Sequence, residues 1–128
     1  MPVAISNNIK VSVETIYQES YSKPLEREFV HAYRITIENL GDYTVQLLRR
    51  HWIIWDAATA MRKVDGEGVV GQQPILQPGE SYQYVSGCPL KSEQGKMEGS
   101  YGFVRLASGD EFEVEIPLFY LYAPFKLN

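Results

Sequence analysis

Apolar and polar residues alternate with a period of two along most of this chain of 128 residues. In residues 111–116, for example, Phe112, Val114 and Ile116 alternate with three glutamates. Successive side chains of a β-strand point to opposite faces, so this period is typical of strands with one buried and one solvent-exposed face. No window of ten residues shows the period of an amphipathic helix. The pattern therefore predicts an all-β protein.

Turn residues separate the segments that show this alternation. The predicted strands are residues 9–14, 29–39, 45–56, 61–64, 81–88, 101–106 and 111–116. We expect residues 29–39 and 45–56 to form a hairpin, and residues 87–99, which contain glycine and proline, to form a polar loop. About seven short strands at regular spacing predict an immunoglobulin-like or fibronectin type III-like β-sandwich. It would have two antiparallel sheets in a single domain over residues 1–128.

Residues 45–56 carry apolar side chains on both faces in part, as a strand in the middle of a sheet does. This segment contains both tryptophans, Trp52 and Trp55. We expect one of them to fill the core, because a tryptophan at the corresponding place does so in immunoglobulin-type sandwiches. The aromatic residues 118–122 have two interpretations, namely the end of the last core strand or an exposed surface for a protein partner.

Charge and composition argue against some classes of partner and indicate a cell compartment. The net charge of −4, with lysines and arginines dispersed among carboxylates, argues against a nucleic-acid partner. The single cysteine cannot form an internal disulfide, and the first residues lack the features of a signal peptide, so we expect a cytoplasmic protein. No uncharged apolar run is long enough to cross a membrane. An exposed sheet edge could pair two copies, so a homodimer is one alternative.

Residues 66–71 spell GxGxxG, a spacing with which backbone N–H groups can close around a phosphate. In a dinucleotide-binding unit a helix follows these glycines, but Pro74 and Pro78 prevent a helix here. A P-loop is excluded as well, because Gln72 and Gln73 occupy the places of its lysine and hydroxyl residue. Two interpretations remain, namely a structural turn or a site for a small anion or nucleotide.

An anion site in this glycine loop would use the backbone amides of Gly66, Gly68 and Gly71, which glycine's conformational freedom can turn toward one ligand. Arg49 and Arg50 are the candidates for neutralising the ligand's charge. Alternatively, these arginines flank a buried tryptophan and extend their charged ends into solvent.

Metal-ligating and catalytic candidates are few. The two histidines, His31 and His51, are weak metal candidates, with Cys88 and the glutamates of residues 111–115, because no HxH, HExxH or CxxC spacing accompanies them. The alternative is that the histidines are structural or surface residues, the cysteine is a small strand-end residue and the glutamates form a solvated face. No nucleophile, base and orienting group occur at a recognised spacing, so we predict a protein that is not an enzyme and has no cofactor.

Several segments together resemble the ApaG family, also called CorD, over nearly the whole chain. They are residues 33–39, 48–52, 66–74, 76–80, 82–84 and 97–101, of which the run from Gly66 to Pro74 is the most specific. The resemblance implies a fibronectin type III-like sandwich, found as a free-standing bacterial protein and as a domain of some eukaryotic F-box proteins and of a polymerase-interacting protein. These contexts imply a domain that recognises a protein partner.

The resemblance also implies a physiological role. In bacteria the family is associated with cobalt tolerance and magnesium efflux. Its glycine motif has been suggested to bind nucleotide pyrophosphate, which would place that ligand on Gly66, Gly68 and Gly71 here. No catalytic residues come with the resemblance.

Overall fold

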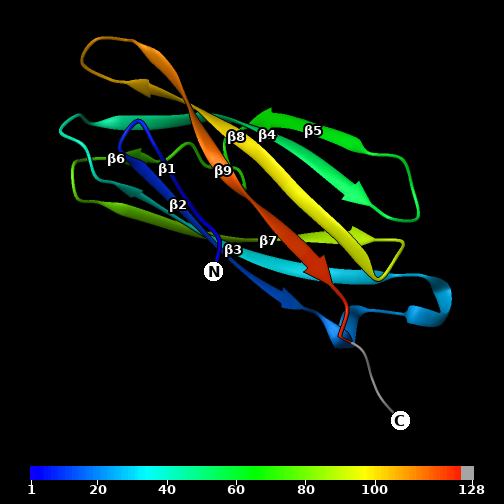
Figure 1. The fold of residues 1–128 in the computed structure, drawn as a ribbon. Coiled ribbons are helices and arrows are strands. Elements are labelled where there is room, and N and C mark those ends of the chain that lie inside the picture. Colours follow the sequence, from blue (N-terminus) through cyan, green and yellow to red (C-terminus); the bar gives the residue numbers. More distant parts are fainter. Residues whose placement is uncertain (125–128) are drawn as a thin grey trace.

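The computed structural model describes residues 1–124. In this part of the chain, nine strands form two antiparallel sheets that face one another (Figure 1). One sheet has the order β1-β2-β3-β7, and the other has the order β5-β4-β8-β9, with β6 also paired to β4. This architecture confirms the predicted all-β sandwich of two antiparallel sheets. It also confirms the strand of residues 45–56 as a central one, because β4 pairs on both sides.

The strands of the first sheet are β1 (Val3–Ser6), β2 (Ile9–Tyr17), β3 (Phe29–Asn39) and β7 (Ser81–Leu90). The strands of the second sheet are β4 (Val45–Asp56), β5 (Arg62–Glu67), β6 (Ile75–Leu76), β8 (Gln94–Arg105) and β9 (Glu111–Tyr122). Two short 3-10 turns, η1 (Glu19–Tyr21) and η2 (Pro24–Glu26), lie in the connection between β2 and β3. Among the described residues, no helix is long and apolar enough to span a membrane.

The predicted hairpin between residues 29–39 and 45–56 is wrong, because β3 and β4 belong to different sheets. Asn39, the buried last residue of β3, holds the corner between them. Its side-chain amide donates to the carbonyl oxygens of Tyr43 and Leu76 at 2.8 and 3.0 Å, and its Oδ1 accepts from the amide of Gly41. These bonds satisfy backbone polar groups at the corner, and the chain can therefore leave the first sheet and enter the second.

The predicted polar loop at residues 87–99 is also wrong, since β7 continues to Leu90 and β8 begins at Gln94. Two glycines of β8 lie where the backbone of β4 comes close. A Cβ on Gly95 would lie 2.6 Å from the carbonyl oxygen of Trp55, and a Cβ on Gly99 would lie 2.0 Å from that of His51. Glycine therefore allows close pairing of β8 with β4 rather than interrupting the strand.

The core between the sheets has an aromatic centre. Trp52 packs edge-on against Tyr33 and Phe119, with ring centroids 5.5 and 5.9 Å apart. Trp52 is 4% exposed, whereas Trp55 is 37% exposed. One tryptophan therefore fills the core, as predicted, and the other lies at the surface.

A buried hydrogen bond between the hydroxyl groups of Tyr84 and Tyr101 joins β7 of one sheet to β8 of the other. Burial raises the pKa of both phenols, so both stay neutral at physiological pH. Each hydroxyl supplies the partner that the other needs in the core.

The aromatic residues 118–122 form the end of β9 and contribute to both of its faces. Phe119 and Leu121 are buried in the core. Tyr120 and Tyr122 point outward with their rings stacked, the centroids 5.6 Å apart. The inner residues thus stabilise the sandwich, while the outer ones form an exposed aromatic surface.

Candidate functional site

The glycine loop is a hairpin turn. Val69 and Gln72 exchange backbone hydrogen bonds of 2.8 and 3.0 Å, and the two residues between them, Val70 and Gly71, have φ angles of 47° and 75°. Positive φ at both central positions is the geometry of a type I′ turn. Gly68, at φ 63°, is needed for a second reason, because a Cβ there would lie 2.3 Å from the carbonyl oxygen of Gln72.

Arg50 lies against this loop, and Arg49 does not. The guanidinium of Arg50 donates through Nη1 to the carbonyl oxygens of Glu67 and Gly68 at 2.9 and 3.0 Å. It also packs over Gly66, where a Cβ would come within 2.7 Å of it. Arg49 instead pairs with Glu111 on the outer face of the sheet, at 3.0 Å.

Several amides of the loop already have partners. The N–H of Gly68 donates to the carbonyl of Leu48 at 2.8 Å, and the amides of Val69 and Gln72 bond one another's carbonyls. The structure therefore brings together Arg50, Gly66 and Gly68 of the predicted anion site, with Gly71 at the turn and Arg49 elsewhere. Binding of an anion to this loop stays a prediction.

The two histidines lie in different sheets and do not share a site. His31 is buried in β3, its Nε2 has no hydrogen-bond partner, and burial lowers the pKa of the ring, which favours a neutral imidazole. His51 lies on β4 with Nδ1 2.8 Å from Oδ1 of Asp65. Within residues 1–124, no group of three or more His, Cys, Asp and Glu side chains is placed to hold a metal ion.

Cys88 is 2% exposed and sits opposite His31 in the pairing of β3 with β7. Burial raises the pKa of its thiol, although the guanidinium of Arg62, with Nη2 3.8 Å from Sγ, acts in the opposite direction. A raised pKa disfavours the thiolate that a nucleophile requires. The glutamates Glu111, Glu113 and Glu115 are exposed in the structure, as a solvated face requires.

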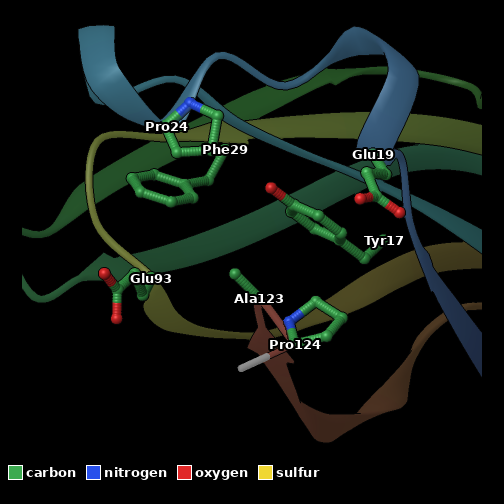
Figure 2. Close-up of a pocket in the computed structure, with 7 residues that line it drawn as sticks. All are labelled: Tyr17, Glu19, Pro24, Phe29, Glu93, Ala123 and Pro124. Atoms are coloured by element: carbon green, nitrogen blue, oxygen red, sulfur yellow. The ribbon is translucent and has the colours of Figure 1, made fainter. Parts of the chain in front are cut away.

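Three neighbouring pockets lie at one end of the sandwich, where the β2–β3, β4–β5 and β7–β8 connections meet the end of β9. A pocket of about 430 Å³ is lined by Tyr17, Glu19, Pro24, Phe29, Glu93, Ala123 and Pro124. Figure 2 shows the side chains of Tyr17 and Phe29 projecting into the space between Pro24 on one side and Ala123 and Pro124 on the other. This pocket is mainly apolar, with carboxylates at its rim.

A second pocket, of about 400 Å³, shares Pro24, Phe29 and Glu93 with the first. It adds the basic residues Arg27 and Lys91, and it extends to Ala57 and Gln94. We call these two connected pockets the end groove.

A third pocket, of about 320 Å³, continues from the end groove through the shared residues Ala57 and Gln94. Trp55, Tyr120, Tyr122 and Lys96 line it, and the Lys96 ammonium lies 5.2 Å from the centroid of the Trp55 ring. We call these four residues the aromatic patch. The rings come from β4 and β9, so pairing of both strands with β8 brings them together.

These pockets are well separated from the glycine loop. Gly68 bonds Leu48 near the start of β4, whereas Trp55 lies near the end of the same strand. At roughly 3.3 Å per residue, Leu48 and Trp55 are about 23 Å apart. The sequence indicated a possible partner surface at the aromatic residues 118–122. It gave no such indication for the β2–β3 connection or for Lys91. The β2–β3 connection and Lys91 share a surface only because the fold brings the β2–β3, β4–β5 and β7–β8 connections and the end of β9 together.

The wall of the end groove formed by residues 18–28 is held rigidly. Lys23 and Glu28 exchange backbone bonds of 2.7 and 3.0 Å, and the amide of Arg27 donates to the carbonyl of Pro24 at 3.0 Å. Ser22 ties the connection to β3, since its Oγ accepts from the amide of Val30 at 2.9 Å. The φ of Arg27 is 55°, an uncommon left-handed conformation for a residue other than glycine.

The opposite wall is held by Asp56, the last residue of β4, which is 5% exposed. Its carboxylate accepts hydrogen bonds from the amides of Lys91 and Ala58, at 2.6 and 3.1 Å, and from the hydroxyl of Ser92, at 2.8 Å. Burial alone would raise its pKa, but these bonds, with a contribution from Arg62, outweigh burial and hold the pKa below its ordinary value. Asp56 thereby joins the β4–β5 and β7–β8 connections.

Comparison with known proteins identifies close relatives. A family model described as "ApaG domain" matches residues 19–105. Protein ApaG of Rhodospirillum centenum is 50% identical over 120 residues, which cover 94% of this chain and 92% of that protein. Protein ApaG of Brucella canis is 48% identical over 121 residues, with 94% and 92% covered. The crystal structure of an ApaA protein from Bordetella pertussis superposes with a TM-score of 0.87 at 42% identity, covering 98% of both chains.

Proposed function

Because the chain belongs to the ApaG-domain family, we propose that it is a non-catalytic module that binds a partner protein at the pocketed end of the sandwich. The observation that supports this most is the aromatic patch. Trp55, Tyr120 and Tyr122 are exposed, come from two strands and line one pocket beside Lys96. Aromatic side chains are enriched at the centres of protein interfaces, because they bury much apolar area and lose little conformational freedom.

Capture of partners from a lysate of the cells that encode the protein tests this function. We expect replacement of Trp55 or Tyr122 by alanine to lower the amount of captured partner about tenfold, a typical effect for an aromatic residue at the centre of an interface. The matched control is Tyr43→Ala. Tyr43 is 54% exposed and Tyr122 is 57% exposed, but Tyr43 lies in the β3–β4 connection, away from the pocketed end. Equal capture by all four proteins would refute the proposal.

We further propose that this module acts in the cytoplasm and that its link to cobalt tolerance and magnesium efflux, implied by family membership, operates through the bound partner. The separation of His31 and His51 into different sheets supports an indirect link, because the two histidines cannot then bind one metal ion together.

Two alternative functions are distinguished by calorimetric titration of the purified protein. We expect no heat of binding with cobalt or magnesium at millimolar concentration. Heat with cobalt that disappears in His51→Ala would show direct metal binding and contradict the indirect link. Heat with pyrophosphate that disappears in Arg50→Gln would identify the glycine loop as an anion site, since Arg50 is the cation that contacts this loop.

A further inference from the structure

The two halves of the end groove differ in chemistry. In the first half, the rings of Tyr17 and Phe29 face Pro24, Ala123 and Pro124, which suits an apolar side chain. The second half carries the basic residues Arg27 and Lys91, both of which are exposed. Since the two halves share Pro24 and Phe29, a single extended ligand can contact both.

The two cations of the second half are without internal acidic partners. Among residues 1–124, neither the Arg27 guanidinium nor the Lys91 ammonium lies in an ion pair or a side-chain hydrogen bond. Elsewhere the same protein pairs its basic residues readily, as in Arg49 with Glu111 and Arg34 with Glu14. Two basic side chains that line the same pocket from opposite walls therefore attract a carboxylate from outside.

The backbone beneath these cations is organised before any ligand arrives. Arg27 follows a 3-10 turn that several backbone hydrogen bonds close, and the amide of Lys91 is held by the carboxylate of Asp56. A preformed wall lowers the ordering cost that binding must overcome. Leu25, at the tip of the same turn, is completely exposed and adds apolar contact area beside the groove.

We propose that the end groove binds an extended acidic segment of the partner protein, an inference that rests on the proposed function. An apolar side chain of that segment enters the pocket of Tyr17 and Phe29. The next carboxylate along it lies against Arg27 and Lys91. A polyphosphate or nucleic acid is a poorer occupant, because Glu93 lines both halves of the groove and repels a ligand that is anionic along its whole length.

Fluorescence polarisation with labelled synthetic peptides tests this groove directly. The probe is an acetylated Ser-Phe-Pro-Asp-Glu-Ser peptide, and its controls replace both acids by their amides or the phenylalanine by serine. We expect the probe to bind, and either control peptide to bind at least about tenfold more weakly, the effect of one lost hot-spot contact. Failure of the probe to bind at millimolar concentration, or equal binding of all three peptides, would overturn the proposal.

Variants of the protein locate the contact. Arg27→Asn removes the charge and keeps a residue that tolerates the left-handed backbone, and Lys91→Glu reverses a charge on the exposed wall. We expect each substitution to lower the affinity for the probe about tenfold. We also expect Lys91→Glu to regain affinity for a peptide with lysine in place of the aspartate. The control is Lys63→Glu, an exposed lysine on β5. An unchanged affinity in Lys91→Glu, or an equal loss in the control, would place the peptide elsewhere.

The same reagents separate this inference from the proposed function. If the probe fails while partner capture still depends on Trp55, partner binding stands and the acidic segment is wrong. If the probe binds through Lys91 while partner capture is unchanged by Trp55→Ala, peptide binding in the end groove is supported and the proposed role of the aromatic patch is wrong.

Discussion

Gly99→Ala is expected to unfold the protein, with a loss of free energy of unfolding greater than about 4 kcal/mol. Gly99 lies in β8 opposite Trp52 of β4, and a Cβ would come within 2.0 Å of the carbonyl oxygen of His51. The obstructing atom is backbone of a central strand, so it cannot move aside as the end of a side chain can. Relief of the clash requires separation of β8 from β4 at the centre of the second sheet. Circular dichroism during urea denaturation measures the effect.

Gly87→Ala is the matched control for this substitution. Gly87 is also a strand residue, in β7, but a Cβ there would meet its nearest neighbour, the carbonyl oxygen of His31, at 3.5 Å, an ordinary contact. We expect its stability to stay within about 1 kcal/mol of the original, with a small gain from reduced freedom of the unfolded chain. A cooperatively folded Gly99→Ala protein with similar stability would contradict the close approach of the two strands.

Asp56→Ala is expected to lower the free energy of unfolding by about 3 kcal/mol, because hydrogen bonds to a charged group contribute more than neutral ones and three donors lose their acceptor. The donors are the amides of Lys91 and Ala58 and the hydroxyl of Ser92. The substitution also removes the hydrogen bonds that hold the segment of Lys91 in place, so we expect weaker binding of the acidic peptide. Urea denaturation and fluorescence polarisation measure the two effects, and Asp42→Ala, at an exposed aspartate, is the control.

The contribution of Asp56 depends on pH in a definite direction. Its pKa in the folded protein lies below its value in the unfolded chain, so the unfolded state binds the proton more readily. The carboxylate therefore stabilises the fold fully above pH about 4, and this stabilisation is lost as the pH falls through the folded-state pKa. We expect the stability difference between the original protein and Asp56→Asn to shrink below pH 4. A difference that stays constant down to pH 2 would show that the charge of Asp56 contributes nothing.

Side-chain alternation was sufficient to predict the all-β class, the two-sheet sandwich and several turns. Residues 77–80 form such a turn, since the amide of Glu80 bonds the carbonyl of Gln77, and Gly79 has the positive φ, 86°, that the third position of a type II turn requires. Such features depend on neighbours in sequence. The predicted hairpin of β3 and β4 failed because the choice of sheet depends on Asn39, whose partners include Leu76, far along the chain.

The candidate site was predicted only in small part. The exposed tyrosines of β9 were visible as an aromatic segment, and one tryptophan near the middle of the chain was expected in the core. That Trp55 rather than Trp52 reaches the surface, and that it meets Tyr120 and Tyr122 in one pocket, follows from pairing of β8 with both β4 and β9. No local pattern encodes that juxtaposition.

Sequence by itself determined the secondary structure class and the family of this protein, because both depend on residue identity and short-range spacing. Only the tertiary structure decided where the pockets lie and which residues line them. It showed that Arg50 donates to carbonyls of the glycine loop, and that Trp55 of the aromatic patch lies about 23 Å away along β4. The physical reason is that a pocket is formed by segments far apart in the chain. Asp56 and the sheet pairings bring Arg27, Lys91 and Trp55 to the same end of the sandwich.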